Sequence, residues 1–229
     1  MMVSILSLIA VGRRPKDIVS ELGVSSRSVT WWLQIAGQAC DLFNTSQVQQ
    51  SNNIQCDEMV VGGKPKYHRG KPVRQSKQLV WVETLATLDG NGRVSGVVAR
   101  HVPDRKATSL VPLIDEVAAP GATLTTDELK SYLSIKHFRP DIHHQTVCHK
   151  RHFVDPNTGV NTNSVECMNR GLKDELRRRF YHPVGRTDDT AKERLAMSVF
   201  SRNCGLKLTP IIPTFFQALA LAHDALTNL

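Results

Sequence analysis

Residues 79–102, LVWVETLATLDGNGRVSGVVARHV, carry the pattern that decides the fold. Two apolar runs rich in β-branched residues, 79–88 and 93–102, flank the segment DGNG at 89–92, whose composition is typical of a tight hairpin turn. A shorter stretch over 54–61, IQCDEMVV, precedes them and ends at two glycines, as a short strand would. The three stretches therefore predict three strands that can form a meander.

Helical and strand patterns alternate after this meander. The apolar spacing predicts an amphipathic helix over 108–118, a fourth strand over 122–126, a second helix over 128–135 and a short strand over 145–148. A long helix is expected from about residue 163 to about residue 179. A meander followed by α-β-α-β-α is the order of ribonuclease-H-like proteins, so we predict an α/β fold with such a core.

The N-terminal part of the chain has the pattern of paired helices. Residues 16–22 carry apolar side chains at helical spacing and end at a glycine, and Ser25 can cap the helix that follows. Two helices joined by a short turn with glycine are typical of a helix-turn-helix. Arg27 and Ser28, on the first turns of the second helix, are candidate DNA contacts. A plain helical hairpin gives the same pattern, and this alternative stays open.

Composition suggests where one region ends and the next begins. The stretch over 44–53 is polar and has no periodicity, so it is expected to be a linker. The predicted organisation is a helix-turn-helix region over 1–43, this linker, a catalytic domain over 54–205 and a C-terminal helical segment over 206–229.

The charge balance favours a polyanionic partner. Lys and Arg total 29 against 21 Asp and Glu, which gives a formal net charge of +8. Binding of basic side chains to phosphates releases condensed counterions, so double-stranded DNA is the expected partner. No apolar run approaches the ~20 residues of a membrane span, and the opening segment lacks the basic start of a signal peptide. We expect a cytoplasmic protein, associated with the nucleoid if bacterial, with no membrane partner.

One basic stretch is a second candidate DNA contact. Residues 59–82 contain six Lys and Arg and no acidic residue. With its glycines, the stretch can form a flexible hairpin tip that follows a DNA backbone. A solvated charged loop explains the composition equally well. The candidate phosphate contacts in this stretch are Lys64, Lys66, Arg69 and Lys71.

Cysteines and histidines give little support for zinc. The five cysteines are widely spaced and include no C-x-x-C pair, so neither a zinc ribbon nor a disulfide framework is indicated. A His-rich stretch over 143–152 matches the spacing of no common zinc finger. We therefore expect no bound zinc. The residues in question are Cys40, Cys56, Cys148, Cys167, Cys204, His143, His144, His149 and His152.

Three acidic residues lie where the predicted sheet would bring them together. Asp57 is on the first strand, Asp127 follows the fourth, and Glu166 is on the first turns of the long helix. Carboxylates are the ligands that Mg²⁺ and Mn²⁺ prefer, and two such ions can catalyse cleavage and transfer of phosphodiesters. Spacing alone does not single these three out, because a chain of this length offers many triples of acids.

The sequence around each acid resembles a known family. CDEMVVGGK at 56–64, TDELKSY at 126–132 and GVNTNSVE at 159–166 are similar to the D-E-x-x-x-G-G-K, T-D-x-x-x-x-Y and H-T-N-x-I-E motifs of Merlin-type DDE transposases and their bacterial insertion-sequence relatives. These relatives carry an ISXO2-like transposase domain. The resemblance covers about residues 54–205, and Asn161 stands where many relatives have His.

The resemblance implies a set of metal ligands. The acids of the three motifs hold the metal in that family, which implies Asp57, Asp127 and Glu166 as catalytic metal ligands here. Some members are described with Asn as the third residue, so Asn163, one turn before Glu166, is the alternative. Two ions, Mg²⁺ or Mn²⁺, are the implied cofactors.

The resemblance also implies basic partners on the long helix. Family members carry basic residues four and seven positions after the Glu, and Arg170 and Lys173 match them. On a helix these offsets place both on the side of Glu166. Lys173 is then a candidate catalytic residue that contacts phosphate beside the metals. For Arg170, a surface ion pair with Glu166 is the ordinary alternative to DNA contact.

The resemblance implies a DDE transposase of an insertion-sequence-like element. Such an enzyme binds terminal inverted repeats, cuts element ends with activated water and joins the 3′-hydroxyls to target DNA. Because two ends are brought together, at least a homodimer is expected. Two alternatives stay open: another ribonuclease-H-like DNA nuclease, and a catalytically inactive helix-turn-helix regulator derived from a transposase.

Overall fold

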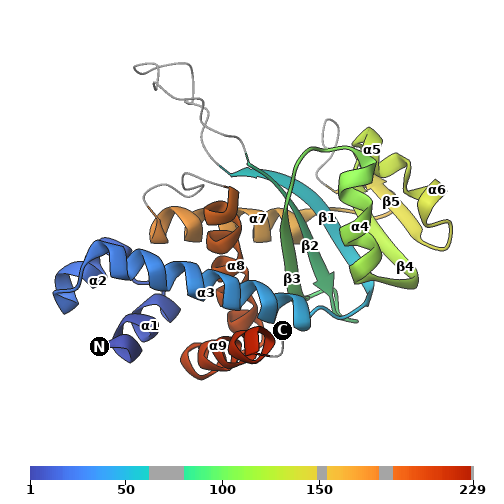
Figure 1. Ribbon diagram of the computed structural model, residues 1–229. Helices are drawn as coiled ribbons and strands as arrows, with labels where there is room; N and C mark the ends of the chain where they lie inside the picture. The colour runs from blue at the N-terminus through green and yellow to red at the C-terminus, as the bar shows by residue number, and fades with distance from the viewer. Residues whose placement is uncertain (62–79, 149–153, 181–187, 228–229) are drawn as a thin grey trace, which may run out of the picture.

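A five-stranded mixed sheet forms the centre of the computed structural model, which describes residues 1–61, 80–148, 154–180 and 188–227 (Figure 1). The strand order is β3-β2-β1-β4-β5, with β1, β2 and β3 antiparallel and β4 and β5 parallel to β1. This arrangement confirms the predicted meander and the order of the elements that follow it, and the two later strands pair in parallel. The strands are β1 (Ser51–Val61), β2 (Val80–Leu88), β3 (Val94–Val102), β4 (Ala118–Asp127) and β5 (His143–Val147).

Helices cover both faces of the sheet (Figure 1). The helices of the described chain are α1 (Met2–Ala10), α2 (Pro15–Leu22), α3 (Ser26–Ser46), α4 (Ala107–Val117), α5 (Lys130–Leu133), α6 (Ile135–Phe138), α7 (Asn163–Arg179), α8 (Asp188–Leu206) and α9 (Ile211–Thr227). Among the described residues, no helix has the length and apolarity needed to cross a membrane.

Strand alternation divides the core in two. Ile54, Leu85 and Leu124 point to one face and pack against α4, α5 and α6. Met59 and Val82 point to the other face, where α7 and α8 pack and where α1, α2, α3 and α9 extend the same apolar cluster. The centre of the sheet is therefore buried on both sides, which explains the long apolar run of β2.

Local side-chain hydrogen bonds explain why the predicted hairpin turn forms and why the helix predicted over 128–135 does not. The predicted hairpin turn is confirmed, because Asp89 Oδ1 accepts from the backbone N–H groups of Asn91 and Arg93 at 2.9 and 2.8 Å. The single helix predicted over 128–135 is wrong, because the structure has the short helices α5 and α6 instead. Asp127 Oδ1 accepts from the Leu129 N–H at 2.9 Å, and this turn delays the start of the helix.

Helix α3 packs directly on α8, which in turn contacts β3. α3 continues to Ser46 and β1 begins at Ser51, so most of the segment expected to be a linker belongs to these two elements. Tertiary contacts hold the end of α3, because Asn44 Nδ2 donates to the Ala196 carbonyl of α8 at 2.9 Å and Phe43 meets Phe200 edge to face. The division into domains itself stays a prediction.

Candidate active site

Two neighbouring parallel strands bring the predicted aspartates together. Asp57 on β1 and Asp127 at the end of β4, both half-buried, form a group with Glu58. One carboxylate oxygen from each of the three residues lies within 4.8 Å of the others. Among the described residues, this is the group of acids, histidines and cysteines with a geometry suited to a metal ion.

The end of strand pairing explains why adjacent residues can converge. Pairing between β1 and β4 ends at Gln55 and Thr125, so β1 has a free edge beyond this point. Asp57 and Glu58 leave opposite faces of the strand, and at a free edge both can turn toward Asp127. The hydrogen bond from the Leu129 N–H holds the Asp127 carboxylate at this position.

The crowded negative charge favours a cation. Burial raises the pKa of Asp57, and the negative charges of Asp127 and Glu166 raise it further. A divalent ion between these carboxylates would relieve their repulsion, and carboxylate oxygens are the donors that Mg²⁺ and Mn²⁺ prefer. The residues present therefore fit the metal that the sequence motifs imply.

Helix α7 begins and ends where the sequence predicts, and β1 anchors its first turn. Gln55 Oε1 accepts from the backbone N–H groups of Ser164 and Val165 at 2.9 and 3.2 Å, which satisfies donors that a helix start leaves free. Gln55 precedes Asp57 by two residues and so shares its face of the strand. This contact fixes the start of α7 beside Asp57.

Glu166 approaches the aspartates from α7 and lies outside their closest group. Its Oε1 accepts from the Thr162 hydroxyl at 3.0 Å, and its charge contributes to the raised pKa of Asp57. The three oxygens within 4.8 Å of one another come from other residues. Asn163, the alternative third residue, is the first residue of α7 and is exposed; its backbone N–H donates to Asn161 Oδ1 at 3.2 Å.

Lys173 lies about two turns further along α7 than Glu166. It is half-buried, and this burial lowers its pKa while the negative charge of Asp57 opposes the shift. The charge of Asp57 therefore acts on the ammonium group of Lys173. Arg170 is exposed on the same helix.

Asn169 is a site residue that the sequence interpretation missed. Its side chain is 5% exposed, and its Nδ2 donates to Asp57 Oδ2 at 2.9 Å. The Asn169 Oδ1 atom is buried and has no hydrogen-bond partner among the described residues. The available signal was its helical offset, three residues after Glu166 and four before Lys173, which places it near the same face.

We expect Asn169→Ala to weaken metal binding about 10- to 100-fold, because Asp57 loses the donor that orients it. Calorimetric titration with Mn²⁺ measures this change. Asn44→Ala is the matched control, because it removes a hydrogen bond of the same length on α3. Equal Mn²⁺ affinities for the two variants would show that Asn169 does not orient Asp57.

Glu58 is a second site residue that the sequence interpretation missed, and an arginine holds its carboxylate. Its side chain is 1% exposed and pairs with Arg105, with both N–O distances at 3.4 Å. The Arg105 guanidinium also lies 4.7 Å from the centre of the Trp81 ring. The sequence signal was the second letter of the D-E-x-x-x-G-G-K motif.

A buried polar layer lies beneath Glu58. Glu83 on β2 stands directly opposite Glu58 and is fully buried. Burial raises the pKa of Glu83 to about 9, so this carboxyl is protonated at neutral pH. The Cys56 sulfur contacts Glu83 at 3.4 Å and the Tyr132 hydroxyl at 3.3 Å. Tyr132 is the last residue of the T-D-x-x-x-x-Y motif. This motif therefore supplies both the acid Asp127 and a residue of the buried polar layer.

Comparison with known protein families agrees with this geometry. The family model described as the ISXO2-like transposase domain matches residues 49–188, which is more than half of the chain. The chain belongs to this family. The matched region runs from just before β1 to the start of α8 and contains every acid of the site. No curated protein matches the chain. Family membership implies transposase activity on DNA with a divalent metal.

The remaining predicted residues of this ISXO2-like transposase are placed as follows. Arg27 and Ser28 lie on the first turn of α3, both exposed, and Ser25 Oγ accepts from the Ser28 N–H at 3.0 Å. The Thr126 hydroxyl and His144 Nε2 are 2.9 Å apart and hydrogen-bonded. Several predicted residues lie outside the described part of the chain: Lys64, Lys66, Arg69, Lys71, His149 and His152.

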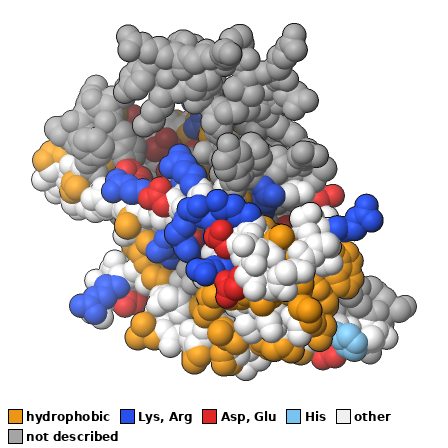
Figure 2. Space-filling model, turned by 90° about the vertical axis from the view of Figure 1, so that its left-hand side faces the viewer, with side chains coloured by type: hydrophobic (Ala, Val, Ile, Leu, Met, Phe, Trp, Pro, Cys, Tyr) orange, Lys and Arg blue, Asp and Glu red, His pale blue; other side chains and the backbone are white. Residues whose placement is uncertain are grey.

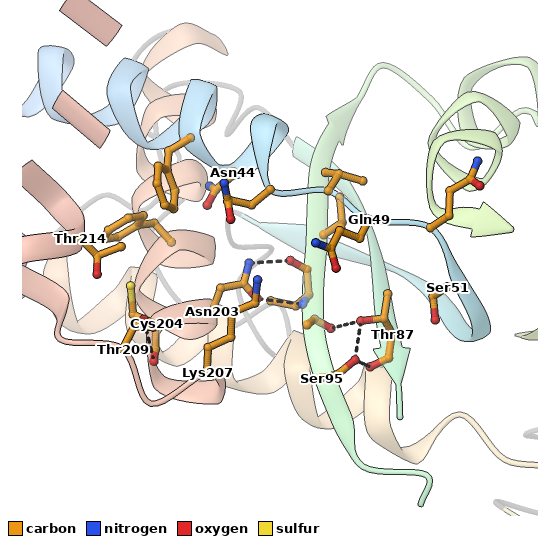
Figure 3. Close-up of a pocket in the computed structure, with 18 of the residues that line it drawn as sticks. Asn44, Gln49, Ser51, Thr87, Ser95, Asn203, Cys204, Lys207, Thr209 and Thr214 are labelled. Atoms are coloured by element: carbon orange, nitrogen blue, oxygen red, sulfur yellow. Dashed lines mark hydrogen bonds between the residues drawn. The ribbon is translucent and has the colours of Figure 1, made fainter. Parts of the chain in front are cut away.

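A pocket lined by both polar and apolar side chains lies away from the acids of the transposase (Figure 3). Its volume is about 390 Å³, and it lies where the end of α3 and the start of β1 meet β3, α8 and α9. Asn203 pairs with the edge strand there, because its side-chain amide accepts from the Val97 N–H and donates to the Val97 carbonyl, both at 2.9 Å. The pocket contains none of the predicted site residues.

Proposed function

We propose that this chain binds the terminal inverted repeats of an insertion-sequence-like element, cuts its ends and joins them to target DNA. The observation that carries the proposal is the group formed by Asp57, Glu58 and Asp127 inside the region matched by the family model. Cutting and joining are one phosphoryl transfer with two nucleophiles, water and a 3′-hydroxyl, so one acidic site can serve both.

Asp57 and Asp127 are the proposed principal metal ligands, with Glu166 as the third. Asn163 is the alternative third residue. Two Mg²⁺ or Mn²⁺ ions, when bound, would supply activation of the attacking oxygen and stabilisation of the leaving oxygen. We favour Asp57 and Asp127 over Glu58, because the Arg105 guanidinium already compensates the charge of Glu58.

The other side chains of the site have proposed roles around the metal ligands. Asn169 orients the Asp57 carboxylate through its hydrogen bond. Lys173, half-buried and near Asp57, is placed to hold a phosphate oxygen of the substrate. Arg170 extends the positive charge along the exposed side of α7. All three roles assume that the phosphate under attack lies beside the metal-binding carboxylates. Because that phosphate occupies the same place in cutting and in joining, the roles apply to both reactions.

The α2–α3 pair is the proposed reader of the element end, as a helix-turn-helix. Gly23 ends α2 in the left-handed conformation with φ of 63°, and Ser25 caps α3. The Ser28 hydroxyl is 2.9 Å from the Ser25 hydroxyl and already hydrogen-bonded to it. Arg27 is exposed and is therefore the stronger candidate for a base or phosphate contact. A dimer or larger assembly, which would hold two ends, belongs to the same proposal.

Arg27→Ala should weaken binding to the cognate end by about 1–3 kcal/mol if Arg27 reads a base. If Arg27 contacts a phosphate instead, the slope of log affinity against log salt should fall by about one. Equilibrium binding at several salt concentrations measures both quantities. An affinity and a slope equal to those of the parent would remove Arg27 from the interface.

A cleavage and strand-transfer assay on end DNA tests the function. With Mg²⁺ or Mn²⁺, the proposed enzyme nicks at the element boundary and joins the 3′-hydroxyl to a second duplex. A plain nuclease would cut without joining, and an inactive regulator would bind without cutting. Either of those results would overturn the proposed function.

A further inference from the structure

Basic residues form a stripe along α7 that leads away from the active site. Glu166, Arg170, Lys173 and Arg177 follow one another at spacings of four, three and four residues. This spacing places them on one side of a helix. Arg170 and Arg177 are exposed and Lys173 is half-buried. The stripe therefore begins at a candidate metal ligand and continues as positive charge toward the C-terminal end of α7.

The end of this stripe is joined to the turn between α1 and α2. Arg14 Nε donates to the Arg178 carbonyl at 2.9 Å, and the buried Arg179 donates from Nη2 to the Ile9 carbonyl at 2.7 Å. A Cβ atom at Gly12 would lie 3.2 Å from Nη2 of Arg178, so that guanidinium packs against the turn. These contacts hold the turn at a fixed distance from the acids.

Exposed arginines from both segments form one patch, which we call the arginine surface. Glu21 pairs with Arg13 at 3.1 Å and Asp174 pairs with Arg177 at 3.4 Å. Arg14 and Arg178 form no ion pair with the described residues, so the patch keeps net positive charge. Figure 2 shows Lys and Arg side chains gathered on this side of the molecule. The arginine surface consists of Arg13, Arg14, Arg177 and Arg178.

We propose that the arginine surface binds the phosphate backbone of the element-end duplex about five base pairs from the phosphate at the active site. The distance follows from α7, because twelve residues from Glu166 to Arg178 at a rise of 1.5 Å span about 18 Å. At 3.4 Å per base pair this is about five base pairs. The inference rests on the proposed function, because it assumes end DNA at the acids.

The arginine surface would fix the distance between its own DNA contact and the phosphate at the active site. The contacts of Arg14 and Arg179 join α1 and α2 to the helix that carries Glu166. DNA held by the arginine surface would therefore place its cleaved phosphate at one distance from that surface. Arginines at the C-terminal end of a helix also stabilise the helix dipole, so the test needs a DNA readout as well as a stability readout.

The test compares two double variants with the same change in net charge. Arg177→Ala with Arg178→Ala removes two cations from the arginine surface, and Arg93→Ala with Lys207→Ala removes two exposed cations elsewhere. The first pair should lower the salt slope of end-DNA binding by about 1.8, at about 0.9 for each lost phosphate contact. The control pair should leave the slope nearly unchanged.

Phosphate ethylation tests the position of the contact. Ethylation about five nucleotides from the cleaved bond should interfere with binding of the parent protein and not with binding of the Arg177→Ala, Arg178→Ala variant. Arg177→Lys with Arg178→Lys should restore the salt slope, because the charges return. If the alanine pair unfolds, the parent still tests the location, because a parent pattern with no interference about five nucleotides from the cleaved bond would contradict the proposed contact.

The outcomes separate this inference from the proposed function. A parent protein that neither binds nor cuts end DNA would overturn the proposed function, whatever the arginines do. A parent that cuts and joins, with equal salt slopes for the alanine pair and the control pair, would overturn the arginine surface alone. An ethylation pattern that is unchanged in the alanine pair would do the same.

Discussion

Asp57→Asn should lower single-turnover cleavage of end DNA by roughly 10³-fold or more, and Asp127→Asn should do the same. Each change removes a charged metal ligand while nearly keeping its volume. The new amide oxygen at position 57 can still accept the hydrogen bond from Asn169, so the fold and the DNA affinity should survive. The loss falls on the chemical step, because the metals stabilise charge that develops in the transition state.

Asp115→Asn is the matched control for both variants. This residue is on α4 and pairs with Arg139 at 3.3 Å, with a half-exposed side chain. The control should cleave at the parental rate. Mn²⁺ titration should show weaker Mn²⁺ binding for Asp57→Asn and for Asp127→Asn, and parental Mn²⁺ binding for the Asp115→Asn control. Cleavage and joining by Asp57→Asn protein at the parental rate would show that the proposed mechanism is wrong.

The parts of the fold that were predicted correctly are those fixed by local periodicity. Helix α7 was predicted from about residue 163 to about residue 179, and it spans Asn163–Arg179, with apolar positions that recur at helical spacing. The hairpin turn at 89–92 was predicted from its own residues, and Asp89 does cap it. The turn is held by contacts within four residues. The periodicity of α7 was enough to predict its bounds, although Gln55 of β1 also anchors its first turn.

The parts that were missed depend on contacts from distant segments. α3 extends to Ser46 because the Ala196 carbonyl and Phe200 of α8 hold its last turn, and neither contact is visible in the composition of 44–53. The same holds in the site. Asn169 becomes a partner of Asp57 only when α7 crosses β1, and Glu58 joins the acids only because pairing between β1 and β4 ends at Gln55.

Glu166→Gln should reduce cleavage at least about 100-fold if Glu166 is the third ligand, whereas Asn163→Ala should cost less than about tenfold. The structure favours this ranking. The charge of Glu166 acts on Asp57, and the Thr162 hydroxyl orients its carboxylate at 3.0 Å. Asn163 is exposed at the first position of α7. Single-turnover cleavage and Mn²⁺ titration of both variants measure the ranking.

Glu128→Gln separates ligand loss from a general loss of negative charge near the metals. Glu128 follows Asp127 in sequence and is exposed, so its neutralisation changes the local field without removing the proposed third ligand. Glu128→Gln should therefore keep Mn²⁺ affinity and cleavage within a few-fold of the parent, since an exposed charge is screened by solvent. If Asn163→Ala were the more damaging change, the third role would belong to Asn163, and Glu166 would act on the site through its charge alone.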